Sequence, residues 1–350
     1  MTARLTATRA LLDTPTPAIP GQLALDYHRK ENHMQITDLF AGPGGWSTGL
    51  RTLGLIETGI ELDPWACATR RAAGHGTVQA DVTLANLADY DATDGLIASP
   101  PCRPWSPGGL REGHLDRSLV AATIDDLAAG HDTRNSHRAA CANPDSLLAA
   151  EPMRWIRALR PQWVAMEQVP AVLPLWQQYA RHLTAWGYST WTGVLNAADY
   201  GVPQSRRRAV LLASRTRTVH APAPSHAGRH VPMHDAIDAV TADTVLVSRR
   251  DSVARLAAHG PRRNRTATEP APTITGEVWR WKWQDDTGTR SVTPSEAGVL
   301  QTFPADYPWQ GPKTRVARQI GDAVPPLLAA HAIAVATGIH VSRPALAPAA

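Results

Sequence analysis

Short apolar runs recur along the first two thirds of the chain, and each is followed by a turn and a more polar segment. The apolar runs lie at 34–40, 57–63, 78–82, 95–98, 163–170 and 209–213. Runs of this length predict buried strands. Intervening segments with a helical pattern lie at 48–53, 64–73 and 146–159. Strands that alternate with helices predict a doubly wound α/β fold with a parallel sheet.

Other stretches lack this pattern. Residues 1–33 are mixed and rich in proline towards their end, which predicts a flexible leader, and residues 341–350 predict a disordered tail. Residues 111–146 are polar and irregular, so we expect a mobile insertion there. Trp279, Trp281 and Trp283 alternate, which predicts one face of a strand in a small core, with a base-stacking platform as the alternative.

The cysteine content and the charge change this picture in two ways. Three cysteines, at 67, 102 and 141, are far apart, which favours free thiols in a reducing cytoplasm. No CxxC pair occurs, and no apolar run approaches the roughly 20 residues of a membrane helix, so we expect neither a metal site nor a membrane span. The net charge is +4, but residues 205–265 contain 12 Arg, 4 Asp and no Lys. This basic stretch indicates either a nucleic-acid partner or a solvated arginine surface.

A glycine-rich turn at 41–47 lies between the first predicted strand and a helix. Strand, glycine turn and helix form a nucleotide-binding unit, and the G-x-G-G spacing favours a ligand such as S-adenosylmethionine over a dinucleotide. Glu61, about 20 residues further on, is placed to bind ribose hydroxyls, with Asp63 as the alternative. Asp81 lies near the end of the third predicted strand and is either an adenine contact or a cap or turn residue.

Two further strands end in reactive groups. Cys102 follows Pro100 and Pro101 at the carboxyl end of the run at 95–98, and Glu167 lies at the end of the run at 163–170. Carboxyl ends of parallel strands meet at one edge, so we expect a nucleophile beside an acid. The alternatives are a cysteine in a proline-rich turn and a capping or salt-bridge glutamate. Arg206 and Arg208 alternate on an extended segment and either hold a carboxylate, phosphate or base carbonyl, or are solvated.

The motifs together resemble those of the DNA (cytosine-5) methyltransferases over about residues 35–338. The matching pieces, in the family's order, are DLFAGPGG at 38–45, ELD at 61–63, ASPPC at 98–102, EQV at 167–169, QSRRR at 204–208, PAPTITG at 270–276, LQTFPADY at 300–307 and IGDAVPP at 320–326. The resemblance implies a Rossmann-like, S-adenosylmethionine-dependent methyltransferase sheet with a small target-recognition domain. It divides the chain into a catalytic domain at 34–213, a recognition domain at 214–290 and a segment at 291–340 that returns to the catalytic domain.

The resemblance also implies roles for single residues. Cys102 would attack C6 of cytosine as a thiolate, with a pKa that nearby arginines and the cofactor lower. Glu167 would hold N3 and the exocyclic amine, and Arg206 and Arg208 would support Glu167 and the base O2. The residues expected to bind the cofactor S-adenosyl-L-methionine are Phe40, Ala41, Gly42, Gly44, Gly45, Glu61, Leu62, Asp81, Val82, Pro100, Asp322 and Val324. Those expected to contact DNA are Arg103, Ser106, Gln204, Arg249, Arg250, Arg262, Arg263 and Arg265, of which Arg265 also matches an arginine that supports the small domain.

Three positions depart from the family pattern. Arg103 and Gln168 replace the usual Gln and Asn after the catalytic Cys and Glu, and Asp322 replaces the Asn of the last motif. We expect a cytoplasmic, nucleoid-associated monomer that methylates cytosine in double-stranded DNA. The alternatives are a tRNA cytosine-5 methyltransferase, whose Cys-Phe-Thr signature is missing here, and a catalytically impaired DNA-binding relative.

Overall fold

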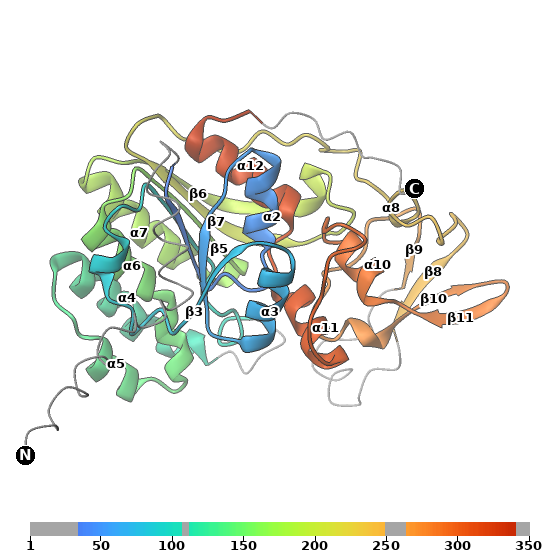
Figure 1. The fold of residues 1–350 in the computed structure, drawn as a ribbon, viewed down its shortest axis with the longest axis horizontal. Coiled ribbons are helices and arrows are strands. Elements are labelled where there is room, and N and C mark those ends of the chain that lie inside the picture. The colour runs from blue at the N-terminus through green and yellow to red at the C-terminus, as the bar shows by residue number, and fades with distance from the viewer. Residues whose placement is uncertain (1–33, 107–111, 249–263, 341–350) are drawn as a thin grey trace, which may run out of the picture. The chain divides into compact units, whose positions relative to one another are not determined.

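The computed structural model describes residues 34–106, 112–248 and 264–340. Within these residues, the larger sheet has seven strands in the order β3-β2-β1-β4-β5-β7-β6 (Figure 1). Its strands are β1 (Ile36–Leu39), β2 (Thr58–Glu61), β3 (Gly76–Gln79), β4 (Gly95–Ala98), β5 (Trp163–Gln168), β6 (Ser189–Asn196) and β7 (Arg207–Ser214). The first five are parallel, and β7 lies antiparallel to both β5 and β6. The predicted doubly wound α/β fold is therefore confirmed.

Helices cover both faces of this sheet. They include α2 (Gly45–Thr52), α3 (Pro64–Ala72), α4 (Gly113–Ala129), α6 (Glu151–Leu159), α7 (Leu173–Ala185) and α12 (Pro326–Thr337). Alternate residues of a buried strand point to opposite faces. Leu96 and Ala98 accordingly join the core cluster with α4, α6 and α7, whereas Ile97 joins the one with α2 and α12. Both faces of β4 are buried, which explains its uninterrupted apolar sequence.

The third strand ends earlier than its sequence predicts. The prediction was 78–82, but β3 pairs with β2 only from Thr58↔Gly76 to Glu61↔Gln79. The chain then turns, because the Asp81 carboxylate accepts hydrogen bonds from the amide and hydroxyl of Thr83. Asp81 consequently lies beyond the carboxyl end of the strand instead of within it.

The expectation of an irregular insertion at 111–146 is wrong for its described part. That part folds into α4, α5 (Arg134–Ala140) and the start of the 3₁₀ helix η3 (Pro144–Ala149), so the helix predicted at 146–159 is also divided between η3 and α6. The polar residues Asp116 and Thr123 face inward on α4, which interrupts the apolar pattern. Asp116 accepts hydrogen bonds from the amides of Ala142 and Asn143 and thereby joins α4 to the segment after α5.

A second sheet has four strands in the order β11-β10-β8-β9 within the described residues. Its strands are β8 (Val245–Ser248), β9 (Arg265–Thr266), β10 (Trp281–Asp285) and β11 (Gly288–Ser291). Trp281 and Trp283 are buried in its core together with residues of α10 (Pro294–Val299) and α11 (Lys313–Asp322). Trp279 instead lies in η6 (Val278–Arg280) and is 47% exposed, so the predicted row of three core tryptophans is wrong at this position. The remaining short elements are η2 (Leu87–Tyr90), η4 (Pro170–Val172), η5 (Ala197–Tyr200) and α8 (Met233–Ala236).

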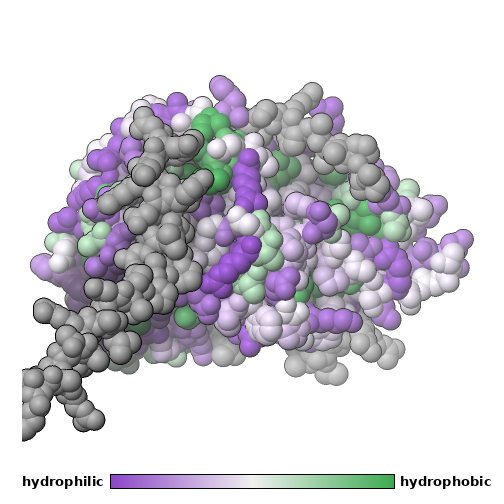
Figure 2. Space-filling model, in the orientation of Figure 1, coloured by the Kyte–Doolittle hydropathy of each residue, from purple (hydrophilic) through white to green (hydrophobic). Residues whose placement is uncertain are grey.

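On the face drawn in Figure 2, apolar surface forms small separate spots among polar residues. Large apolar side chains that are exposed include Leu62, Trp65 and Leu84. The helical stretch Lys313–Thr337 is long and apolar enough, by length and composition, for a membrane span, although 67% of its most apolar window is buried inside the protein. Burial of this kind is usual for the core helices of globular proteins.

Candidate active site

A cavity of about 580 Å³ opens at the carboxyl ends of β1, β2, β4 and β5. Ligands bind at this edge in open α/β sheets. The cavity brings together most of the residues singled out in the sequence. Its lining includes Phe40, Ala41, Gly42, Gly45, Glu61, Leu62, Asp81, Val82, Pro100, Cys102, Arg103, Glu167, Arg206, Arg208, Asp322 and Val324.

The glycine turn after β1 requires unusual backbone geometry. Phe40 and Gly42 have φ values of 59° and 55°, and Gly44, the N-cap of α2, has a φ of 103°. A Cβ on Gly45 would lie 2.1 Å from the carbonyl oxygen of Val324, so this glycine lets the turn and the last motif meet backbone to backbone. Gly44 lies against His75 and Tyr307 and is not among the residues that line the cavity.

The two acids after β2 have different roles. Glu61 accepts hydrogen bonds from the amides of Gly42 (2.7 Å), Leu62 (2.8 Å) and Asp63 (2.7 Å) while it lines the cavity. Asp63 is the N-cap of α3 and accepts from the amides of Trp65 and Ala66. A carboxylate has about four lone-pair sites, so Glu61 retains capacity for a ligand hydroxyl.

Asp81 is a turn residue that also lies at the cavity. Its Oδ1 accepts from the amide (2.9 Å) and the hydroxyl (2.8 Å) of Thr83, which makes it a turn residue. Asp81 and Val82 also line the cavity. Its second oxygen, Oδ2, makes no hydrogen bond within the described part of the chain and can accept from a ligand.

Cys102 and Glu167 line the same cavity, at the ends of the neighbouring strands β4 and β5. Glu167 is buried, and its Oε1 lies 2.8 Å from Nε of Arg208. Ser99 hydrogen-bonds to Glu167, and its hydroxyl accepts from the indole of Trp46 at 2.8 Å. The nucleophile and the acid predicted from separate strands therefore meet in one site.

Burial dominates the acid–base properties of this pair. It raises the pKa of Glu167, although Arg208 and Arg206 act in the opposite direction, so this carboxyl takes up a proton more readily than an exposed glutamate does. Burial also raises the pKa of the Cys102 thiol, and the negative charge of Asp322 raises it further. Arg208 and Arg206 lower the pKa of Cys102, but their effect is smaller than that of burial. The expected lowered pKa of Cys102 is therefore wrong for the protein alone, because desolvation outweighs the arginines.

Arg206 lines the cavity but makes no hydrogen bond to Glu167 in the described part of the chain, and Gln204 is buried. Arg206 donates to the carbonyls of Ile274 (3.0 Å), Gly321 (2.9 Å) and Ala323 (2.9 Å), and burial lowers its pKa to about 9. It ties the segment at Ile274 to the segment that contains Gly321 and Ala323 instead of hydrogen-bonding Glu167. Gln204 is fully buried and its amide is bonded to backbone atoms of Ile274 and Leu300, so it is not at a surface that DNA could reach.

The three departures from the family pattern fit the local structure. The amide of Gln168 donates to the carbonyl of Pro100 and accepts from the amide of Val169. It therefore joins the cysteine loop to the glutamate strand. Arg103 is exposed at the cavity, and Asp322 is half-exposed with Nε of Arg318 3.4 Å from its carboxylate.

The expected DNA contacts are only partly described. Ser106 lies in the turn after Cys102 but does not line the cavity, and Arg265 pairs with Glu269 at 3.1 Å. The expected contacts at Arg249, Arg250, Arg262 and Arg263 lie outside the described residues.

Residues that the sequence did not indicate also line the cavity, including Arg138, Asp145, Leu148, Arg315 and Arg318. These residues lie in segments between the motifs, and nothing else in the sequence marks them as site residues. The described ranges contain no group of three or more His, Cys, Asp or Glu side chains that could hold a metal ion.

Comparison with known proteins shows which family this chain matches. The family model for C-5 cytosine-specific DNA methylase matches residues 34–124, 134–245 and 229–337. Type II methyltransferase M1.HphI of Haemophilus parahaemolyticus is 28% identical over 344 residues, covering 83% of this chain and 83% of the relative. Type II methyltransferase M.NlaX of Neisseria lactamica is 28% identical over 83% of this chain and 92% of its own length. Among solved structures, S. pombe Dnmt2 methyltransferase has a TM-score of 0.62 at 15% identity, covering 87% of this chain and 99% of that one, which supports the fold.

Proposed function

Because the chain belongs to the C-5 cytosine-specific DNA methylase family, we propose that it transfers a methyl group from S-adenosylmethionine to C5 of cytosine in double-stranded DNA. The observation that carries this proposal is that Cys102 and Glu167 line one cavity with the glycine turn. A thiol and a buried acid beside a nucleotide-binding turn are the groups that this reaction needs.

The cavity fits the cofactor on chemical grounds. Glu61 retains acceptor capacity for ribose hydroxyls, and the free Oδ2 of Asp81 can accept from the adenine amino group. Phe40, Pro100 and Val324 provide apolar walls between these polar groups. When bound, S-adenosylmethionine supplies the methyl group as an electrophilic sulfonium.

The chain's own groups would activate the base. Sγ of Cys102 forms a bond to C6 of cytosine, while the protonated Glu167 donates its proton to N3, so C5 gains enamine character. Arg208 keeps the Glu167 carboxyl oriented through the 2.8 Å contact. After C5 has been methylated, water takes the C5 proton, the electron pair of that bond re-forms the C5–C6 double bond and expels Cys102 as a thiolate, and N3 returns its proton to Glu167.

The direction of the Glu167 pKa shift supports this assignment, because a raised pKa makes the carboxyl easier to protonate, as a proton donor requires. Because burial raises the pKa of the Cys102 thiol, we propose that the thiol gives its proton to solvent as the substrate is bound, with Arg208 and Arg206 as the nearby cations. The target atoms lie inside the duplex, so the base must be flipped out to reach the cavity. We propose the basic stretch 205–265 as part of the DNA surface, and action on DNA in the cytoplasm.

The proposal is tested with tritiated methyl transfer to mixed-sequence duplex DNA and to tRNA. We expect label in DNA but not in tRNA, and none above background for Cys102→Ser. Labelling confined to tRNA would favour the RNA-directed alternative. Absence of transfer by a folded, DNA-binding protein would favour the impaired relative. Labelling of DNA by Cys102→Ser would contradict the role of the nucleophile.

A further inference from the structure

The turn at 81–85, which carries Asp81 into the cavity, is held from behind by two arginines. Arg154 donates to the carbonyls of Val82 (2.8 Å) and Ala85 (3.3 Å), and Arg134 donates to the carbonyl of Thr83 (3.1 Å). Three carbonyls of one short turn are thus bound by charged donors. Hydrogen bonds to charged groups are stronger than neutral ones, so this turn is held unusually firmly.

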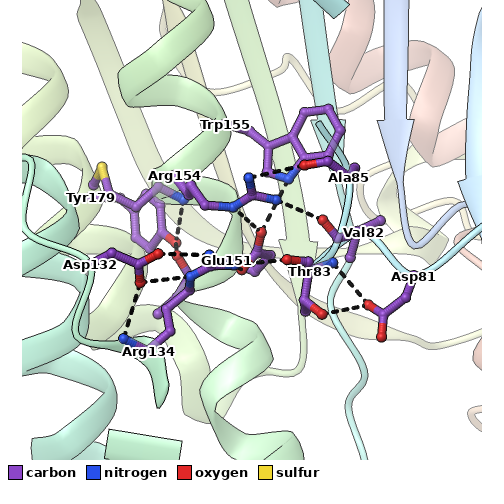
Figure 3. Close-up of polar contacts among 12 residues, drawn as sticks. Asp81, Val82, Thr83, Ala85, Asp132, Arg134, Glu151, Arg154, Trp155 and Tyr179 are labelled. Atoms are coloured by element: carbon purple, nitrogen blue, oxygen red, sulfur yellow. Dashed lines mark hydrogen bonds and ion pairs between the residues drawn. The ribbon is translucent and has the colours of Figure 1, made fainter. Parts of the chain in front are cut away.

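Both arginines depend on one buried carboxylate. Glu151, at the start of α6, is 1% exposed, and its Oε1 and Oε2 lie 2.6 Å from Nε of Arg154 and 2.8 Å from Nη1 of Arg134. Figure 3 shows both guanidinium groups between Glu151 and the backbone of the turn. The Trp155 indole donates to the same carboxylate at 3.3 Å, and Asp132 binds the outer side of the Arg134 guanidinium.

The hydrogen bonds continue from Glu151 to the cavity. Arg134 binds the carbonyl of Thr83, and the amide and hydroxyl of the same Thr83 bind Oδ1 of Asp81. The orientation of the Asp81 carboxylate, and with it the position of the free Oδ2, is therefore fixed through Thr83. Leu84, in the same turn, is 83% exposed, whereas Val82 is buried in the core, so the turn is held by the packing of Val82 and by the two arginines at its carbonyls.

We propose that Glu151, acting through Arg134 and Arg154, is the positioning residue for Asp81, and that these three residues set the cavity's preference for an adenine ring over a ring without the amino group. We call Glu151, Arg134 and Arg154 the carbonyl clamp. The inference rests on the proposed function, because it assigns the clamp to the cofactor part of that same cavity. It also gives α5, which carries Arg134, a part in ligand recognition.

The test measures ligand selectivity by calorimetry. S-adenosylhomocysteine carries the amino group that Asp81 would accept from, whereas S-inosylhomocysteine has a carbonyl oxygen there. In the unmodified protein we expect S-adenosylhomocysteine to bind about tenfold more tightly or better. In Arg134→Met, the ratio of the two dissociation constants should fall to within about threefold of unity, as it should in the reference variant Asp81→Ala.

The matched control is Arg157→Met. Arg157 lies one turn beyond Arg154 on α6 and donates to the carbonyl of Ala128 at 3.2 Å, away from the cavity. It should keep the selectivity of the unmodified protein. Glu151→Gln should lower the ratio as well, but its buried ion pairs make Arg134→Met the safer variant to fold.

Retention of the full ratio by folded Arg134→Met would overturn the inference, as would an equal loss in Arg157→Met. Both results would leave the proposed function intact, because the unmodified protein would still bind and discriminate. Failure of the unmodified protein to bind S-adenosylhomocysteine at all would overturn the proposed function and the clamp together.

Discussion

The side of the cavity with the glycine turn is held by hydrogen bonds to the backbone, whereas the side with Cys102 and Glu167 is held by buried charges. On the first side, Glu61 accepts from three amides and Asp81 is fixed through Thr83. On the second side, burial shifts the pKa of both Cys102 and Glu167 upwards. The first arrangement favours fixed recognition of a ligand, and the second favours proton transfer and nucleophilic attack. Substitutions on the two sides should therefore separate binding from chemistry.

The largest expected effect is on the acid of the second side. Glu167→Gln keeps the shape of the side chain but removes the proton that would be given to N3. The single-turnover rate of tritiated methyl transfer should fall by about 10²- to 10⁴-fold. Binding of S-adenosylhomocysteine should stay unchanged. A transfer rate close to that of the unmodified protein would show that Glu167 is not the proton donor.

Arg208→Met should reduce both transfer and stability, since it leaves the buried Glu167 without its ion pair. We expect the free energy of unfolding in urea to fall by about 3 kcal/mol or more. Arg207→Met is the matched control, because Arg207 is the next residue and is exposed; its effect should stay within about 0.5 kcal/mol. Equal losses of stability in the two variants would contradict the importance of the buried pair.

Glu61→Ala tests the first side. It removes the acceptor proposed for ribose, so the dissociation constant of S-adenosylhomocysteine should rise about tenfold, which corresponds to 1.4 kcal/mol. The transfer rate at saturating S-adenosylmethionine should change less than about threefold. A large fall in the saturated rate with unchanged binding would mean that the two sides are not separable as described.

The smallest effect is expected from Asp322→Asn. Asp322 raises the pKa of Cys102, so its neutral replacement should lower that pKa. Since the thiolate is the reactive form, iodoacetamide should alkylate Cys102 faster as the pH rises, and the Asp322→Asn curve should lie at lower pH. Mass spectrometry of the Cys102 peptide gives the rates, and Cys141 serves as an internal reference. A curve shifted to higher pH would contradict the assigned electrostatics.

Much of the large sheet could be predicted from the sequence, because buried parallel strands such as β4 and β5 are continuous apolar runs. The same runs located Cys102 and Glu167, since each reactive residue lies at the end of such a strand. The helices α4 and α5 were missed because inward-facing Asp116 and Thr123 interrupt the apolar pattern, and their polar partners are distant in sequence or contributed by the backbone.

The electrostatics of the site were harder to predict. Alternation predicts that Arg206 and Arg208 point the same way, and both line the cavity, but only the fold shows that Arg206 binds three carbonyls while Arg208 binds Glu167. The direction of the Cys102 pKa shift depends on burial, which no local motif encodes. The carbonyl clamp joins α5, α6 and the turn after β3, so its formation also depends on tertiary structure.

The central claim is that Cys102 attacks C6 of a flipped cytosine in this cavity. Trapping of the covalent adduct between the protein and DNA tests this claim most directly. A duplex with 5-fluorocytosine at the target position, incubated with S-adenosylmethionine, should form a lasting covalent adduct, because C5 no longer carries a proton to lose. Mass spectrometry should locate the DNA on the peptide that contains Cys102, with no adduct in Cys102→Ser. An adduct on Cys67 or Cys141, or methylation of ordinary DNA without any Cys102 adduct to the fluorinated duplex, would contradict the account.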